Sequence, residues 1–199
     1  MNNLFLYDMT VESTTILYGP GKRIVLWCSG CHIRCPGCTN IHLWNKDSGK
    51  QYSTLEVYNY ILSQTNIEGI TLHGGEPSEQ LEAFTELLEM CGSRYNKILF
   101  TGKEIEDFVT EQEKIFIGLF DIVKCGPFIQ SKLGSEFIFM GSSNQRIINQ
   151  TNRIQIDLNK KEQQVTLFKI NFDGSLSLQG FPKKEHLEII KELDIEEEK

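Results

Sequence analysis

The sequence contains no long hydrophobic run and no basic start followed by an apolar leader. A membrane-spanning helix needs about 20 consecutive apolar residues, so we expect neither a transmembrane segment nor a signal peptide. Hydrophobic residues make up 40% of the 199 positions, which is ordinary for a globular protein. We therefore expect a cytoplasmic protein without membrane contact, long enough for one domain with a small appendage.

Positive charge is also scarce. The chain has 20 Lys and Arg against 27 Asp and Glu, which gives a net charge of -7. Proteins that bind nucleic acids or membrane surfaces without sequence preference usually carry an excess of basic residues. The charge therefore argues against a nucleic-acid partner, and it leaves open a small phosphorylated substrate or a protein partner.

The six cysteines are the most informative residues present. Disulfides are rare in a reducing cytoplasm, so these thiols are free for other roles. Four of them lie within eleven residues, at Cys28, Cys31, Cys35 and Cys38. Thiols packed this densely in a cytosolic protein indicate a metal centre.

The spacing of these cysteines favours one type of centre. A zinc site usually takes two Cys-x2-Cys turns separated by a dozen or more residues, but here only three residues separate Cys31 from Cys35. A compact loop around one [4Fe-4S] cluster fits better. If residues 23–28 form a strand, Cys28 shares its apolar face with Ile24 and Leu26, which predicts a buried, inert thiol. Three ligands then leave one iron open. A closed four-ligand cluster and a small zinc knuckle are the alternatives.

Strand and helix patterns alternate through the first two thirds of the chain. Apolar runs predict strands at 23–28, 69–73, 97–100 and 121–124. A capping box at 53–56 precedes a helix with Leu55, Tyr58, Ile61 and Leu62 on one face. Ser78 is expected to cap a second helix, which ends at Gly92 and has an apolar face, and a third helix is expected through Ile105, Phe108 and Val109. The apolar face of the second helix comprises Leu81, Phe84, Leu87, Leu88 and Cys91. This alternation predicts an α/β fold of parallel βα units.

The pattern changes after about Gly126. Residues 128–152 predict a long loop, a feature that is often functional. Alternating apolar residues then predict antiparallel strands at 153–157, 165–170 and 176–178, with turns at 159–162 and 173–174. A last amphipathic helix is expected through Leu187, Ile190 and Leu193. We expect a domain at 1–150 and a C-terminal β-hairpin plus helix appendage at 151–199.

The turn Gly74-Gly75-Glu76-Pro77 lies between a predicted strand and a predicted helix. Two glycines let a backbone approach a ligand closely and expose its amides, and Glu76 is placed to accept a hydrogen bond from a ligand ammonium. A plain βα turn is the simpler interpretation. Because the cysteine loop also follows a parallel strand, both loops are expected to face one cleft at the carboxyl edge of the sheet.

Taken together, Cys31-x3-Cys35-x2-Cys38 and Gly74-Gly75-Glu76-Pro77 resemble the radical S-adenosylmethionine (SAM) superfamily. Further matches narrow the resemblance to the activating protein of the anaerobic (class III) ribonucleotide reductase, a glycyl-radical enzyme activase, over roughly residues 5–147. These matches are Gly19-Pro20-Gly21-Lys22-Arg23, Pro36-Gly37, Trp44, Thr101-Gly102, Gly126-Pro127-Phe128 and Gly141-Ser142-Ser143-Asn144-Gln145.

The resemblance implies a partial (β/α) barrel in which Cys31, Cys35 and Cys38 bind a [4Fe-4S] cluster. Gly37 and Thr39 would flank SAM. Gly74, Gly75 and Glu76 would hold its methionine end, and Thr101 would line the same site.

The implied activity is a reductive cleavage of SAM to a 5′-deoxyadenosyl radical, which takes a hydrogen from a glycine of a partner such as anaerobic ribonucleotide reductase. The electron would come from a one-electron donor such as flavodoxin or ferredoxin. The cofactors carry the chemistry, and the protein orients them and excludes water.

Several positions depart from this family pattern. No aromatic residue adjoins Cys38, Cys125 precedes Gly126 where Asp is typical, Met140 stands where Arg is usual, and His73 stands where many relatives have Ser. These departures keep two alternatives open: an activase-like enzyme that modifies another protein, a peptide or a small molecule, or a non-catalytic iron–sulfur or zinc protein. The position of His73 makes it a further candidate neighbour of SAM.

Overall fold

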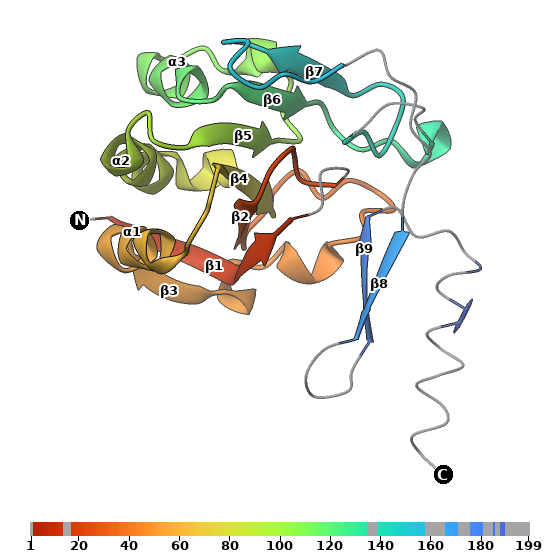
Figure 1. Ribbon diagram of the computed structural model, residues 1–199. Coiled ribbons are helices and arrows are strands. Elements are labelled where there is room, and N and C mark those ends of the chain that lie inside the picture. Colours follow the sequence, from red (N-terminus) through yellow and green to blue (C-terminus); the bar gives the residue numbers. More distant parts are fainter. Residues whose placement is uncertain are drawn as a thin grey trace.

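A computed structural model describes residues 2–13, 17–134, 139–157, 166–170, 176–180, 185, 188 and 189. Its centre is a seven-stranded sheet in the order β3-β1-β2-β4-β5-β6-β7 (Figure 1). The strands are β1 (Asn3–Glu12), β2 (Arg23–Cys28), β3 (Lys50–Ser53), β4 (Gly69–Gly74), β5 (Asn96–Phe100), β6 (Ile122–Cys125) and β7 (Arg146–Asn149).

The middle of this sheet is parallel and its edges are antiparallel. Strands β2, β4, β5 and β6 run parallel, whereas β1, β3 and β7 pair with their neighbours in the antiparallel sense. In the described part of the chain the two outer strands, β3 and β7, do not pair with each other, so the sheet is open. The predicted α/β fold with parallel βα units is confirmed.

Three helices lie along one side of the sheet, as Figure 1 shows: α1 (Thr54–Ser63), α2 (Leu81–Cys91) and α3 (Glu111–Gly118). The main core lies between them and the strands, and burying each large apolar side chain there stabilises the fold by about 1.5–3 kcal/mol. The core takes Ile24, Leu26 and Cys28 from β2, Ile70 and Leu72 from β4, Leu99 from β5, and Phe84, Leu87, Leu88 and Phe116 from the helices.

The side chains on the opposite side of the parallel strands form what we call the inner face. Strand alternation places Val25 and Trp27 there from β2, and Ile98 and Phe100 there from β5. Val25 packs with Leu17 and Tyr18, and Ile98 and Phe100 pack with Ile122 and Phe139. The assignment of Cys28 to the apolar face of Ile24 and Leu26 is thus confirmed.

Capping boxes predict where these helices begin better than the spacing of apolar residues does. Both capping-box bonds are present at Ser53 and Glu56, as predicted, but α1 buries Val57 and Ile61 and leaves Leu55 and Leu62 exposed. A capping box formed by Thr110 and Glu113 starts α3, after the position that we predicted for the third helix.

Two other predictions about helices are wrong. The expected helix through Ile105, Phe108 and Val109 is only a 3-10 turn at Ile105–Asp107, and Val109 is exposed. Ser78 does not cap α2, because its backbone amide bonds the Glu76 carboxylate in a 3-10 turn at Pro77–Gln80 that precedes the helix. The predicted helix end at Gly92 is confirmed, with a positive φ of 56°.

Three strands at or beside the sheet edges escaped prediction: β3 and β7 are the outer strands, and β1 lies between β3 and β2. Strands β1 and β3 pair with each other beside β2, and β7 lies inside the segment predicted as a loop. That segment also holds a 3-10 turn at Gln130–Lys132. Residues 153–157 form no strand. Edge strands expose one side to solvent, so their alternation is weaker and harder to recognise.

A separate hairpin follows the sheet. Strands β8 (Thr166–Ile170) and β9 (Leu176–Gly180) pair antiparallel, as predicted, and Leu167 packs against Leu17, Tyr18 and Val25. The turns predicted at 159–162 and 173–174 and most of the final predicted helix lie outside the described residues. The division at 150/151 stays a prediction. Among the described helices, none is long and apolar enough to cross a membrane.

Candidate functional site

The cluster loop, residues 29–40, leaves β2 at the carboxyl edge of the parallel strands. Backbone bonds fix its first residues: the Ser29 amide donates to Phe5 of β1 (3.0 Å), the Gly30 amide to Leu43 (2.9 Å) and the Cys31 amide to Trp44 (3.0 Å). Leu43 belongs to a short 3-10 turn, Ile41–Leu43, and is fully buried. The loop is therefore held from both sides before its first predicted ligand.

The four clustered cysteines fall into two environments. The side chains of Cys31, Cys35 and Cys38 are partly exposed, whereas Cys28 is fully buried. Burial, followed by the negative charge of Glu76, raises the pKa of Cys28 well above its usual value. Burial also raises the pKa of Cys31, and the amides of Arg34 and Ile33 act in the opposite direction. Because a thiol binds metal as the thiolate, burial makes Cys28 a poor metal donor.

The donor set fits a cluster better than a single ion. Over the described residues, no group of three or more His, Cys, Asp or Glu side chains could hold one metal ion. A tetrahedral zinc site requires such convergence on a point. A [4Fe-4S] cluster takes each thiolate at a separate iron, so three partly exposed thiols on one short loop meet its requirement.

The Gly-Gly-Glu turn docks directly on the cluster loop. The Gly75 amide donates to the Cys28 carbonyl (2.7 Å) and the Glu76 amide to the Gly30 carbonyl (2.8 Å). The expectation that the glycine amides are exposed to a ligand is therefore wrong for Gly75. A Cβ added at Gly75 would lie 2.2 Å from the Gly30 carbonyl oxygen, so glycine is required there for the close approach of two chain segments.

A second contact joins the same two segments. Glu79, in the 3-10 turn after the Gly-Gly-Glu sequence, accepts the backbone amide of His32 at 2.6 Å. Its other carboxylate oxygen lies 2.8 Å from Nδ1 of the His32 ring. The turn after β4 thus supports the cluster loop immediately beside Cys31.

Glu76 fastens the ends of two neighbouring strands. Its side chain is 1% exposed. One carboxylate oxygen accepts hydrogen bonds from the Ser78 amide (3.0 Å) and the Thr101 hydroxyl (2.8 Å), and the other accepts one from the Gly102 amide (2.8 Å). The structure therefore brings Glu76 and Thr101 together at the carboxyl edge, as the sequence predicts, and gives the carboxylate a structural role that the sequence did not reveal.

The other predicted SAM contacts lie around the cluster loop. Gly37 has a φ of +78°, and a Cβ there would lie 2.7 Å from the Gln130 side-chain amide carbon. Gly102 closely approaches Ile33, since its Cβ would lie 2.8 Å from an Ile33 methyl. Thr39 is exposed. The loops after β2, β4 and β5 and the segment containing Gln130 therefore meet at one edge of the sheet.

A row of four side chains crosses the inner face just beneath these loops. Trp27, His73, Phe100 and Lys124 come from β2, β4, β5 and β6 in turn, and we call them the inner row. Trp27 pairs with His73 and Phe100 with Lys124 in the strand register. The rings of Trp27 and His73 stack at 4.6 Å, those of His73 and Phe100 lie 5.0 Å apart, and Lys124 Nζ lies 5.4 Å from the Phe100 centroid.

The inner row has unusual electrostatics. Burial, with a smaller effect of Lys124, lowers the pKa of His73 to about 3, so its imidazole is neutral at pH 7. The sequence singled out His73 but not Lys124 as a site residue. The alternation of β6, in which Val123 and Cys125 enter the main core, is the signal that assigns Lys124 to the inner face.

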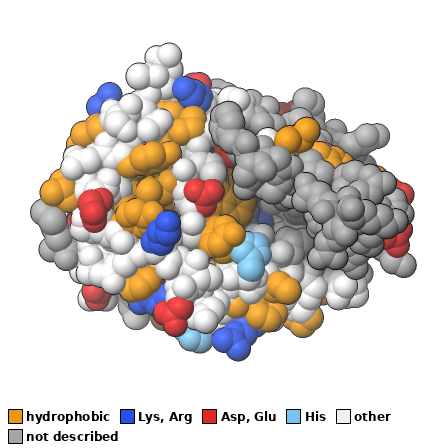
Figure 2. All heavy atoms as spheres, turned by 90° about the horizontal axis from the view of Figure 1, so that it is seen from below, with side chains coloured by type: hydrophobic (Ala, Val, Ile, Leu, Met, Phe, Trp, Pro, Cys, Tyr) orange, Lys and Arg blue, Asp and Glu red, His pale blue; other side chains and the backbone are white. Residues whose placement is uncertain are grey.

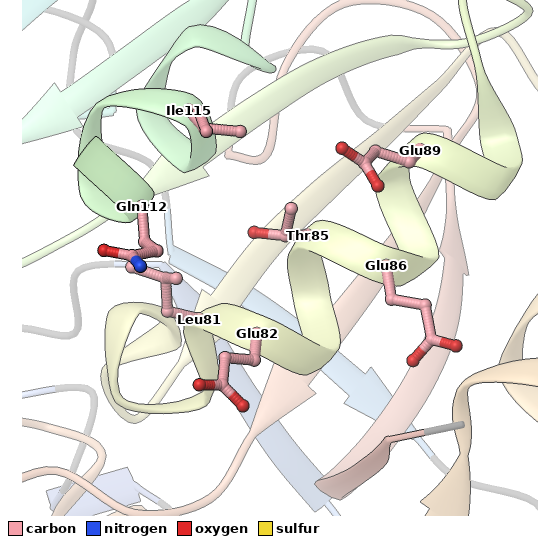
Figure 3. A pocket seen from close by; sticks show the side chains of 7 residues that line it. All are labelled: Leu81, Glu82, Thr85, Glu86, Glu89, Gln112 and Ile115. Atoms are coloured by element: carbon pink, nitrogen blue, oxygen red, sulfur yellow. The ribbon is translucent and has the colours of Figure 1, made fainter.

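One surface groove lies away from this site. It has a volume of about 290 Å³ between α2 and α3, and Figure 3 shows the acidic side chains of α2 around it. Its lining residues are Leu81, Glu82, Thr85, Glu86, Glu89, Gln112 and Ile115. On the face shown in Figure 2, acidic and basic side chains are interspersed with hydrophobic ones, without a large patch of either sign.

Comparison with known proteins gives consistent matches. Residues 17–148 match the family model of the 4Fe-4S single cluster domain. The anaerobic ribonucleoside-triphosphate reductase-activating protein of Enterobacteria phage T4 is 29% identical over 68% of this chain and 89% of that protein. The protein of the same name from Escherichia coli K12 is 30% identical over 65% of this chain and 90% of that protein. The pyruvate formate-lyase-activating enzyme of Clostridium pasteurianum is 32% identical over 41% of this chain and 37% of that enzyme.

Proposed function

Because the chain belongs to the 4Fe-4S single cluster domain family and to the family of anaerobic ribonucleoside-triphosphate reductase-activating proteins, we propose that it is a radical SAM activase. In this proposal it installs a glycyl radical on a partner enzyme, anaerobic ribonucleotide reductase. The observation that supports this most strongly is the separation of three partly exposed thiols from one fully buried thiol in the same cysteine run.

We assign Cys31, Cys35 and Cys38 as the cluster ligands. Their loop is anchored at its start by β1 and the Ile41–Leu43 turn, and a bond from the Cys38 amide to the Cys35 carbonyl (3.1 Å) tightens its end. Cys28 is excluded because burial on the helix side of the sheet disfavours its thiolate. Three thiolates would leave one iron open for SAM.

When bound, the cluster and SAM supply a 5′-deoxyadenosyl radical through one-electron cleavage of a carbon–sulfur bond. The residues of this chain position that reaction. Glu76, whose carboxylate is held by Thr101 and Gly102, would meet the amino group of SAM. Gly74, with a φ of +107°, shapes the backbone beside it, and Gly37 and Thr39 would flank SAM. The partial (β/α) barrel is proposed on the basis of the four parallel strands.

The substrate is a protein. The partner's glycine would give up a hydrogen atom and become a glycyl radical, and a one-electron donor such as flavodoxin or ferredoxin would supply the electron. The reaction needs no nucleic acid or membrane and takes place in the cytoplasm. The names of the relatives, which activate a reductase or a lyase, support a glycyl-radical enzyme as the target.

A second candidate changes only the target. The hairpin of β8 and β9 lies beyond the residues that match the family model, and it packs through Leu167 against the inner face. An activase-like enzyme with this addition would modify a different protein or peptide. The proposed domains, 1–150 and 151–199, correspond to the shared and the added parts.

The test uses the full chain reconstituted anaerobically with iron and sulfide. It should bind about four irons, and with dithionite and SAM it should release 5′-deoxyadenosine. Added anaerobic ribonucleotide reductase should then show a glycyl-radical signal in electron paramagnetic resonance. Release of 5′-deoxyadenosine without that signal supports the second candidate, and a four-iron protein that neither binds nor cleaves SAM contradicts both.

A further inference from the structure

Lys124 is a partly buried lysine on the inner face. It is the last inward-facing residue of β6 and stands at the end of the inner row beside Phe100, and its carbonyl accepts a hydrogen bond from the amide of Thr101 (2.9 Å), a residue of the site. Among the described residues its ammonium makes no hydrogen bond or ion pair, and it lies over the Phe100 ring, 5.4 Å from the ring centroid. An ammonium in such a position normally requires a negative partner.

The negative charges near Lys124 belong to the site itself. Burial lowers the pKa of Lys124 to about 8, and the charges of Glu76, Cys125, Cys35 and Cys38 act in the opposite direction. Glu76 already accepts three hydrogen bonds from the chain, and Cys125 is buried in the main core. Two thiols, those of Cys35 and Cys38, therefore remain as the groups whose charge changes when a cluster is bound.

Other lysines at this edge differ from Lys124. Lys103, after β5, lies over the Phe108 ring at 5.3 Å and pairs with Glu113 at 3.4 Å. Lys46 lies over Phe5 and is exposed, so solvent screens its charge. Lys103 is therefore a suitable control for Lys124, because it also lies over an aromatic ring but its charge is already balanced by Glu113.

We propose that Lys124 is a positioning residue that sets the reduction potential of the cluster. The inference rests on the proposed function. One-electron reduction, by an external donor, adds one negative charge to the cluster and its three thiolates. The ammonium of Lys124 stabilises that added charge, because a fixed positive charge in a region that is poorly screened by water favours the more negative state. It therefore raises the potential and makes the electron easier to accept.

The test is a redox titration of the reconstituted full chain without SAM, monitored by electron paramagnetic resonance. In Lys124→Met the ratio of reduced to oxidised cluster at a fixed potential should fall by about tenfold, which for one electron is a shift of about 59 mV to lower potential. Lys124→Gln should shift in the same direction, and Lys124→Arg should restore the wild-type value. Lys103→Met, the matched control, should leave the potential unchanged.

The outcomes separate this inference from the proposed function. A wild-type chain that takes up no iron overturns both. Iron-replete Lys124→Met and Lys124→Gln proteins with the wild-type potential overturn the role of Lys124 alone. An equal shift in Lys103→Met also overturns it, since the effect would then be a general response to lost positive charge. A lowered potential in Lys124→Met, whose side chain can still pack on Phe100, beside a wild-type potential in Lys124→Arg excludes a role limited to packing.

Discussion

The hydrogen bonds to the Glu76 carboxylate lead to a prediction about the free energy of unfolding. Thr101→Val keeps the shape of the side chain but removes the hydroxyl that donates to Glu76 at 2.8 Å and accepts from the Lys103 amide at 3.0 Å. A buried hydrogen bond to a charged group contributes about 1.5–3 kcal/mol. Adding the unsatisfied Lys103 amide, we expect the free energy of unfolding to fall by about 2–4 kcal/mol.

The measurement is urea unfolding of wild type and variant, prepared identically and followed by circular dichroism. The urea midpoint should fall while the slope with denaturant concentration stays constant, because the change acts on the folded state. Thr101→Ser, which retains the hydroxyl, should stay within about 1 kcal/mol of wild type. If Thr101→Val unfolds within about 0.5 kcal/mol of wild type, Glu76 does not fasten β4 to β5 in the way described.

Two further predictions concern the turn and the inner row. Gly75→Ala should lower both the melting temperature and the iron content, because its Cβ would lie 2.2 Å from the Gly30 carbonyl oxygen. Gly118→Ala is the control: a Cβ there would meet no atom within 4 Å, so the melting temperature should stay the same or rise slightly. An unchanged Gly75→Ala protein would refute the close approach. The pKa of His73 is about 3 in the folded protein, against an ordinary 6.5. On acidification the imidazole is therefore protonated in the unfolded chain before it is protonated in the folded protein. The folded state loses stability as the pH falls below 6.5. Between pH 7 and pH 5, His73→Phe should therefore lose about 2 kcal/mol less unfolding free energy than wild type, and equal losses would show that the ring is not held neutral.

Much of the sheet could be predicted because its central strands are buried on both sides. Continuous apolar runs at β2, β4 and β5 leave little ambiguity, and the strict alternation of β2 correctly separates Cys28 from the inner face. Edge strands lack this signal. β7 therefore went unrecognised although Ile147 and Ile148 pair with β6.

Helix positions were harder to predict, for a local reason. At α3 the Thr110–Glu113 capping box decides the start, and the spacing of Ile105, Phe108 and Val109 gave a competing apolar pattern that the structure does not use. At α2 the Glu76 carboxylate takes the amide of Ser78, so the helix begins later than a Ser cap would place it.

The residues of the candidate site could be predicted from the sequence, but the contacts between them could not. The cysteine spacing and the Gly-Gly-Glu turn follow directly from the sequence. Long-range partners do not: Glu76 meets Thr101 at a separation of 25 residues, and His32 meets Glu79 at 47. The inner row is likewise assembled from four strands, so its members become neighbours only once the strand order and register are known.

Iron content after anaerobic reconstitution tests the division of the cysteine run most directly. The chain with Cys28→Ala should hold about four irons and cleave SAM as wild type does, whereas Cys31→Ala, Cys35→Ala and Cys38→Ala should each lose the intact cluster and the cleavage. A Cys28→Ala protein that loses its iron, beside a Cys31→Ala protein that keeps it, would contradict the assignment of three ligands and an open iron.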